Sequence, residues 1–441
     1  MDLALMNAAE AHTALRDGRI ASEELVLACL EQISRLEEQV GAWAFVDRDL
    51  ALSQAREADR ALQAGRPLGP LHGIPVGIKD IFDTSDLPCE DGTVLHAGRR
   101  PLHDATAVAR LREAGAVILG KTVTTELAVY APGKTRNPHD LNRTPGGSSS
   151  GSAAAVAAGM VPLALGTQTN GSVIRPASFC GVYGFKPTFG SISRHLVLQQ
   201  SRPLDQIGVF ARSIEDAALL AEALMGYDAQ DPDTRMQAHP ALRATAMQEV
   251  PVEPRLAFVK TPVWDKADET TREAFAELAV SLGERAPKAE LPEIFDHAHE
   301  QHRLIMEADL ARSFAREYRD GRQQLSQVLT EMIERGQQVR AVEYNNAVGS
   351  IEPLYQTLDK LFEWHDAIIT PATIGEAPVG LTSTGSPIFC TIWTLLGMPA
   401  LTIPLMQGQS GMPLGVQLVG PRGDDARLLR TARWLMAQIT Q

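Results

Sequence analysis

Residues 145–188 read PGGSSSGSAAAVAAGMVPLALGTQTNGSVIRPASFCGVYGFKPT, a stretch rich in glycine, alanine and serine. Between Thr144 and Phe185 only Arg175 is charged, although glycines and hydroxyl side chains are frequent. A surface loop would carry more charge, so this composition predicts a buried segment. Two polar loops, PGGSSSGS and TQTNGS, flank an alanine-rich helix and the short strand VPLALG. Because each unsatisfied buried hydroxyl costs about 1–3 kcal/mol, we expect the two loops to contact each other.

The composition of the whole chain is that of a globular protein with a substantial core. Of its 441 residues, 44% are hydrophobic and 22% are charged. Its 41 basic and 54 acidic residues give a net charge of −13, which argues against nucleic acid or an anionic membrane as a partner. No secretory signal is visible, and the four scattered cysteines favour a reducing compartment. We therefore predict a cytoplasmic protein.

Helical and strand-like patterns alternate outside the central stretch, which predicts an α/β fold. Residues 1–65 carry a helical pattern, and a strand-like segment, GIPVGI, follows them. The apolar runs RLAFV at 255–259 and AIIT at 367–370 bracket a long, charged and mostly helical segment. We predict a single domain over residues 1–441, with a variable helical region at 225–365 that shapes the substrate entrance.

Three patterns resemble known functional sites, but the residues around them do not fit those sites. Residues 115–122, GAVILGKT, match a phosphate-binding loop, but their apolar centre predicts a strand instead. Residues 147–151, GSSSG, match a nucleophile elbow, but no apolar strand precedes them. His297, His299 and His302 cluster in an acidic helical segment, and we expect a solvated helix face there rather than a metal site.

The loop TQTNGS has the pattern of an oxyanion hole. Successive backbone amides at Thr169, Asn170, Gly171 and Ser172 can point at one position where negative charge develops on a carbonyl oxygen. A serine at the end of such a loop is well placed as a nucleophile, provided that a base lies nearby. The sequence therefore predicts acyl-transfer chemistry at this loop.

Lys79 is the candidate base, because no histidine lies in or near the polar stretch. The lysine ends the apolar strand GIPVGI, and burial at that position would disfavour its charged form and lower its pKa. An ion pair of Lys79 with Asp80 or Asp83 at the strand end is an equally simple interpretation. From the residues alone, both interpretations stay open.

The long run from GGSSSGS to GFKPT resembles the amidase signature family. The segments HGIPVGIKD at 72–80 and GMPLGVQLVGP at 411–421 resemble the lysine segment and the C-terminal strand motif of that family. The resemblance extends from about residue 70 to the C-terminus and is weakest between residues 225 and 365. It implies the amidase signature fold, in which helices cover both faces of a mixed central β-sheet.

The resemblance also implies a Ser–Ser–Lys triad, with no metal and no cofactor. Ser172 matches the nucleophile of the family and Lys79 matches its base. Ser148 matches the bridging serine, which follows a cis peptide bond in the family. The oxyanion hole would be formed by the amides of Thr169, Asn170 and Gly171 up to that of Ser172.

Two departures from the family pattern GTDTGGSIRxPA occur in this chain. Gln168 replaces the aspartate and Asn170 replaces the first glycine, where an asparagine tolerates a left-handed backbone better than most residues. The arginine stands one place later, in SVIRPA, which resembles the malonamidase-like branch, where the matching arginine contacts the substrate carboxylate. We expect Arg175 to bind substrate, with a structural ion pair as the alternative.

These observations predict a serine hydrolase that cleaves the C–N bond of a small amide through an acyl-enzyme. A carboxylate-bearing amide, malonamate-like or ureido-carboxylate-like, would suit Arg175. One alternative is an aryl or acyl amidase with an apolar pocket formed by residues 386–399, including Phe389 and Trp393. Another is the glutamine-hydrolysing subunit of an amidotransferase complex. We expect a small-molecule amide as the partner and leave a homodimer open.

Overall fold

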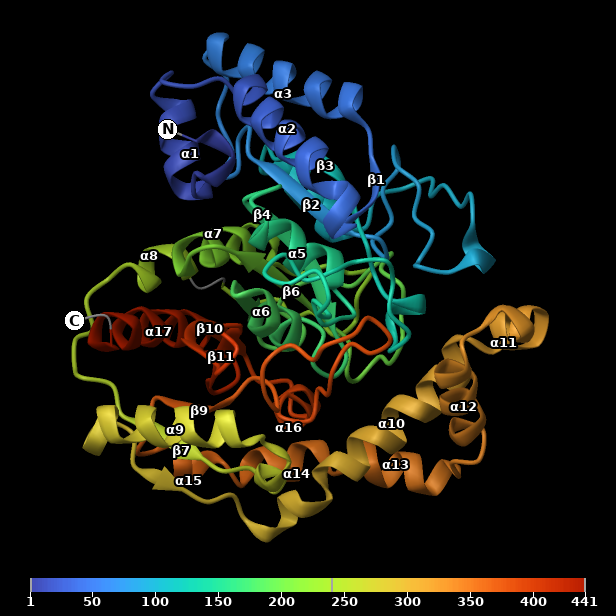
Figure 1. Ribbon diagram of the computed structural model, residues 1–441, viewed down its shortest axis with the longest axis vertical. Helices are drawn as coiled ribbons and strands as arrows, with labels where there is room; N and C mark the ends of the chain where they lie inside the picture. Colours follow the sequence, from blue (N-terminus) through green and yellow to red (C-terminus); the bar gives the residue numbers. More distant parts are fainter. Residues whose placement is uncertain (1, 239–240, 440–441) are drawn as a thin grey trace.

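A mixed β-sheet runs through the middle of the molecule (Figure 1). The computed structural model describes residues 2–238 and 241–439, and within these residues eleven strands form the sheet in the order β1-β3-β2-β4-β6-β5-β10-β11-β9-β7-β8. The strands are β1 Trp43–Val46, β2 Pro75–Lys79, β3 Val117–Thr122, β4 Leu163–Gln168, β5 Tyr183–Lys186, β6 Gln206–Ala211, β7 Leu256–Val259, β8 Lys288–Ala289, β9 Ala367–Pro371, β10 Ala400–Gln407 and β11 Pro413–Val419. Strand β2 pairs in parallel with both β3 and β4, whereas β4 and β6 are antiparallel.

Helices surround this sheet. The α-helices are α1 Ala8–Arg16, α2 Ser22–Val40, α3 Arg48–Gln63, α4 Thr106–Glu113, α5 Ser150–Ala157, α6 Ile174–Cys180, α7 Ile214–Leu224, α8 Leu242–Ala246, α9 Glu269–Leu282, α10 Ala298–Ser313, α11 Ala315–Gly321, α12 Gln327–Gly336, α13 Ala341–Gly349, α14 Ile351–Gln356, α15 Asp359–Phe362, α16 Thr391–Leu395 and α17 Asp425–Ile439. No helix in the described part of the chain is long and apolar enough to cross a membrane.

Both faces of the sheet are covered, as the alternating side chains of β10 illustrate. Leu401 and Ile403 pack in the same hydrophobic cluster as Leu428 of α17. Between them, the Thr402 hydroxyl points to the opposite face and donates a hydrogen bond of 2.9 Å to the carbonyl of Ile174 in α6. Because successive side chains of a strand point to opposite faces, α6 and α17 lie on different sides of the sheet. The predicted fold class is therefore confirmed.

Small side chains let α5 pack closely against the sheet. All residues of α5 from Ser150 to Val156 are buried. A Cβ atom on Gly151 would lie 2.2 Å from the carbonyl oxygen of Ala42 and 2.3 Å from the amide nitrogen of Val123. Only glycine fits at such a distance, because these two neighbours are backbone atoms. The glycine- and alanine-rich stretch thus places the loop that precedes α5 deep inside the molecule.

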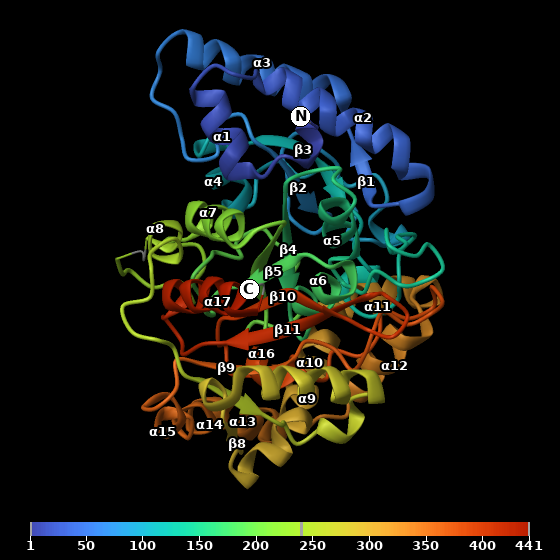
Figure 2. The same ribbon diagram turned by 60° about the vertical axis from the view of Figure 1, so that its left-hand side comes forward.

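The structure adds detail to the predicted regions at the two ends of the molecule. Figures 1 and 2 show α1–α3 at one end and α9 together with α13–α15 at the opposite end. Residues 2–65 contain α1–α3 and also contribute the edge strand β1, which the helical pattern did not predict. The described part of residues 225–365 contains α8–α15 and the two strands β7 and β8, and residues 117–122 of GAVILGKT form the buried strand β3.

Candidate active site

Three polar side chains from separate segments meet at the ends of β2 and β4. These strands are parallel neighbours, so their carboxyl ends lie at the same edge. Lys79, the last residue of β2, is fully buried, and its Nζ donates hydrogen bonds to Ser148 Oγ at 2.7 Å and to Thr167 Oγ1 at 2.8 Å. The Gly147–Ser148 peptide bond is cis. The structure thus brings together the lysine and the first serine of the predicted triad.

The ion-pair interpretation of Lys79 is wrong, because other cations occupy both candidate carboxylates. Asp80 lies 3.2 Å from Lys121, which is itself fully buried. Asp83 accepts two hydrogen bonds from the guanidinium of Arg99. Burial holds the pKa of Lys79 well below its ordinary value, which makes the neutral amine accessible.

Asp205 is the carboxylate that acts on this lysine through its charge. Its negative charge raises the pKa of Lys79 and so opposes the larger effect of burial. The Asp205 carboxylate accepts hydrogen bonds from Thr169 Oγ1 at 2.7 Å and from the amides of Gln200 and Ser201. Burial raises the pKa of Asp205 itself to about 6, against the lowering effect of these hydrogen bonds.

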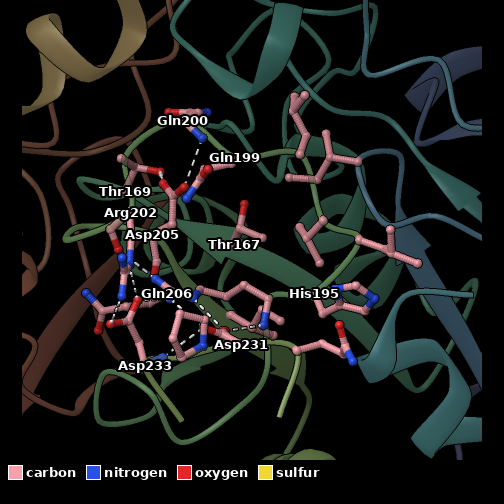
Figure 3. Close-up of a pocket in the computed structure, with 18 residues that line it drawn as sticks. Thr167, Thr169, His195, Gln199, Gln200, Arg202, Asp205, Gln206, Asp231 and Asp233 are labelled. Atoms are coloured by element: carbon pink, nitrogen blue, oxygen red, sulfur yellow. Dashed lines mark hydrogen bonds and ion pairs between the residues drawn. The ribbon is translucent and has the colours of Figure 1, made fainter. Parts of the chain in front are cut away.

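A cavity of about 350 Å³ lies beside this cluster (Figure 3). Thr167, Thr169, Asp205 and Gln206 line it together with residues 194–200, Arg202 and residues 230–233 of neighbouring loops. Thr167 is also a hydrogen-bond partner of Lys79. This hydroxyl therefore connects the buried lysine to a space that is large enough for several water molecules.

The loop after β4 is held by its carbonyl groups. The Thr169 carbonyl accepts a hydrogen bond of 2.9 Å from Nε2 of His302, which extends from α10. The Asn170 carbonyl accepts one from the hydroxyl of Thr394 in α16, and the Gly171 carbonyl accepts one of 2.9 Å from the backbone of α6. Three successive peptide planes therefore each have a fixed donor.

The amides of the same loop are free. In the part of the chain that the structure describes, the N–H groups of Asn170, Gly171 and Ser172 have no hydrogen-bond acceptor. Buried backbone N–H groups are almost always paired, so three consecutive free donors are exceptional. Ser172 itself is buried, with 8% of its surface exposed. Such a set of donors is suited to bind a developing oxyanion.

Gln168, the first departure from the family pattern, connects the start of α6 to α16. Its Oε1 accepts hydrogen bonds from the N–H groups of Val173 at 2.8 Å and Ile174 at 3.0 Å, at the start of α6. Its Nε2 donates to Thr394 Oγ1 at 2.9 Å. A carboxylate at this position could accept the first two bonds but could not donate the third. The amide thus orients the hydroxyl that holds the Asn170 carbonyl.

Asn170, the second departure, is held by its side chain. Its Oδ1 accepts a hydrogen bond of 2.8 Å from Thr391, and its Nδ2 donates one of 3.0 Å to the hydroxyl of Tyr130. Asn170 is not among the described residues with positive φ, so this position does not use the tolerance of asparagine for a left-handed backbone. The asparagine fits because its amide bridges two neighbouring elements.

Arg175 is fully buried behind these loops. Its Nη1 donates to the Gly385 carbonyl at 2.9 Å and its Nη2 donates to the Gly147 carbonyl at 2.6 Å. Its Nε has no partner among the described residues, and no described carboxylate pairs with it. Burial lowers the pKa of this guanidinium. Contact between Arg175 and a substrate stays a prediction.

The histidine cluster does not form the solvated face that the sequence predicts. His302 is only 2% exposed and contacts the Thr169 carbonyl, as described above. His299 is half-buried, and its Nε2 donates to the Ile388 carbonyl at 3.0 Å. Only His297 is exposed. Among the described residues no group of three His, Cys, Asp or Glu side chains could hold a metal ion.

Comparison with known proteins establishes the family. A model of the Amidase family matches residues 24–429. The chain is 34% identical to a glutamyl-tRNA(Gln) amidotransferase subunit of Chloroflexus aggregans, over 97% of this chain and 95% of that protein. It is 35% identical to the corresponding protein from Acidothermus cellulolyticus, over 99% of this chain and 95% of that protein. The chain therefore belongs to the Amidase family and is an amidohydrolase of that family.

Solved structures of similar chains support the same assignment. One, from a vestigial protein complex that reveals the origins of an s-triazine catabolic enzyme, matches with a TM-score of 0.91 and 28% identity over 98% of both chains. The peptide amidase of Stenotrophomonas maltophilia matches with a TM-score of 0.85 and 28% identity, over 99% of this chain and 97% of that chain. The similar proteins include an amidotransferase subunit and a peptide amidase, so the shared fold alone does not identify the substrate.

Proposed function

We propose that this amidohydrolase cleaves a small carboxamide through an acyl-enzyme on Ser172, with Ser148 and Lys79 as the proton relay. The observation that carries the proposal is the contact of the buried Lys79 with Ser148 Oγ at 2.7 Å, beside a loop with three free amides. A lysine with a lowered pKa can act as a base near neutral pH.

The reaction begins with neutral Lys79. The amine accepts the Ser148 proton while Ser148 accepts the proton of Ser172, and the Ser172 oxygen forms a bond with the amide carbon. The C–N bond then breaks, and the leaving nitrogen takes a proton back along the same relay. Water hydrolyses the resulting ester by the same steps, which releases the acid and restores Ser172.

The negative charge of each tetrahedral intermediate would be held by the loop after β4. We assign this role to the amides of Thr169, Asn170 and Gly171 together with that of Ser172. The hydrogen bonds to the carbonyls of Thr169, Asn170 and Gly171 support the assignment, because they hold the peptide planes of the loop. Donors that are already fixed need no reorganisation during the reaction.

For the substrate we propose a small carboxamide that also bears a carboxylate. Support comes from Arg175, whose buried positive charge lacks a carboxylate partner among the described residues. Within this class the relatives favour glutamine over malonamate or a ureido-carboxylate, since they are named as glutamyl-tRNA(Gln) amidotransferase subunits. A glutamine-hydrolysing subunit would require a protein partner. The aryl amidase alternative lacks support, because Phe389 and Trp393 are core residues.

The test is ammonia release by the purified chain from glutamine, malonamate, a ureido-carboxylate and an uncharged amide such as propionamide. We expect turnover of at least one carboxylate-bearing amide and none by Ser172→Ala. We also expect Arg175→Gln to raise KM for that amide more than for propionamide. An equal loss on both amides would contradict the carboxylate assignment, and turnover by Ser172→Ala would contradict the triad.

A further inference from the structure

Helix α10 belongs to the charged helical region, yet one of its side chains directly contacts the loop after β4, which leads to Ser172. His302 is 2% exposed, and its Nε2 lies 2.9 Å from the carbonyl oxygen of Thr169. A carbonyl only accepts hydrogen bonds, so Nε2 carries the proton in this contact. The two residues are far apart in the sequence, and the triad mechanism assigns no role to this histidine.

We propose that His302 is a positioning residue that orients the Asn170 N–H toward the oxyanion. The inference rests on the proposed function, because it assumes that Asn170 is an oxyanion donor. In a trans peptide the carbonyl and the following N–H point in opposite directions. A hydrogen bond that fixes the Thr169 carbonyl therefore also fixes the direction of the Asn170 N–H.

The other hydrogen bonds of the loop hold other groups, so His302 is the residue that holds the peptide plane between Thr169 and Asn170. Thr394 holds the next peptide plane through the Asn170 carbonyl, and the backbone of α6 holds the one after it. The Asn170 side chain is fixed by Thr391 and Tyr130, but these contacts act on the side-chain amide. Of the three planes, only the one before Asn170 depends on the helical region.

The surroundings of His302 suit a permanent, neutral donor. Burial lowers the pKa of His302 to about 4, so the ring stays uncharged near neutral pH. Helix α10 is held in place by Ile305 and Met306 in the hydrophobic core and by packing against α16. A second donor from the same helix, His299, contacts the Ile388 carbonyl in the segment before α16. The helical region thus contributes to the catalytic geometry itself.

The experiment compares His302→Leu with His302→Gln in the full chain. Glutamine can place an amide N–H close to the position of Nε2, whereas leucine removes the donor and keeps an apolar side chain. The readout is the second-order rate constant for modification of Ser172 by a fluorophosphonate, which needs no knowledge of the natural substrate. His297→Leu is the matched control, because His297 precedes the same helix but is exposed.

We expect His302→Leu to react about 10- to 100-fold more slowly, somewhat less than the loss of a whole oxyanion donor. His302→Gln should react within about threefold of the unmodified chain, and His297→Leu should not differ from it. The thermal midpoint of each variant shows whether it is folded. An unchanged rate in a folded His302→Leu variant, or equal losses in the leucine and glutamine variants, would overturn the proposal. Modification of Ser172→Ala at the normal rate would instead overturn the proposed function.

Discussion

Replacing Asp205 by asparagine tests the electrostatics of the site. The carboxylate accepts hydrogen bonds from Thr169, Gln200 and Ser201, and its charge acts on Lys79. Asparagine has nearly the same shape, and its amide can keep these partners if the Thr169 hydroxyl turns to accept. The substitution therefore removes a charge with little change in packing.

The first expected effect is on stability. Burial raises the pKa of Asp205 from 3.8 to about 6, so the folded state binds this proton more tightly than the unfolded state. The unmodified chain therefore loses stability as the pH rises through this interval, by about 3 kcal/mol in total. Asparagine does not ionise, so the stability of Asp205→Asn relative to the unmodified chain should rise by about this amount between pH 4 and pH 8.

The second expected effect is on the pH dependence of activity. The Asp205 charge raises the pKa of Lys79, so its removal should lower that pKa further. Because the neutral amine is the base, the acid limb of the kcat/KM profile should move to lower pH in Asp205→Asn.

Urea unfolding at several pH values and ammonia release across the same range measure these two effects. Asp216→Asn is the control, because Asp216 is also a buried carboxyl with a raised pKa but contacts the start of α1 instead of the site. It should leave the acid limb in place. An acid limb that stays in place or moves to higher pH in Asp205→Asn would contradict an effect of the Asp205 charge on Lys79.

Two further substitutions test the loop and its support. Thr394→Val removes the donor to the Asn170 carbonyl and the acceptor of the Gln168 amide, so kcat should fall about tenfold and the free energy of unfolding by about 1–3 kcal/mol. Steady-state kinetics and urea unfolding measure both, and normal kcat would contradict a supporting role. Gly151→Ala places a Cβ 2.2 Å from the Ala42 carbonyl, so it should lower the unfolding free energy by about 2 kcal/mol or more. An unchanged urea midpoint would show that the backbone can move apart there.

Local composition was sufficient to predict the central part of the fold. The near absence of charge between Thr144 and Phe185 predicted burial, and the structure buries all of β4 and α5 from Ser150 to Val156. The apolar residues at the centre of GAVILGKT predicted a strand, and the structure has β3 there. These features depend on hydrophobic burial and chain geometry, and both follow from the pattern of residues that are neighbours in the sequence.

Contacts between distant segments could not be predicted in the same way. His302 was expected on a solvated face because its neighbours are charged, yet the fold turns this one side chain toward Thr169. Its spacing of three residues from His299 places both on one side of a helix, but nothing local tells what that side faces. Likewise, Gln168 differs from the family pattern for a reason that appears only with Thr394, which lies on a distant helix.

The most direct measurement is the mass of the intact chain when turnover of its best amide is stopped rapidly with acid. We predict a species heavier by the acyl group of that amide, with the modification mapped to Ser172 and absent from Ser172→Ala. In Lys79→Met the same species should form far more slowly, because the relay lacks its base. An acyl group on another residue, or normal turnover with Ser172 absent, would contradict the proposed mechanism.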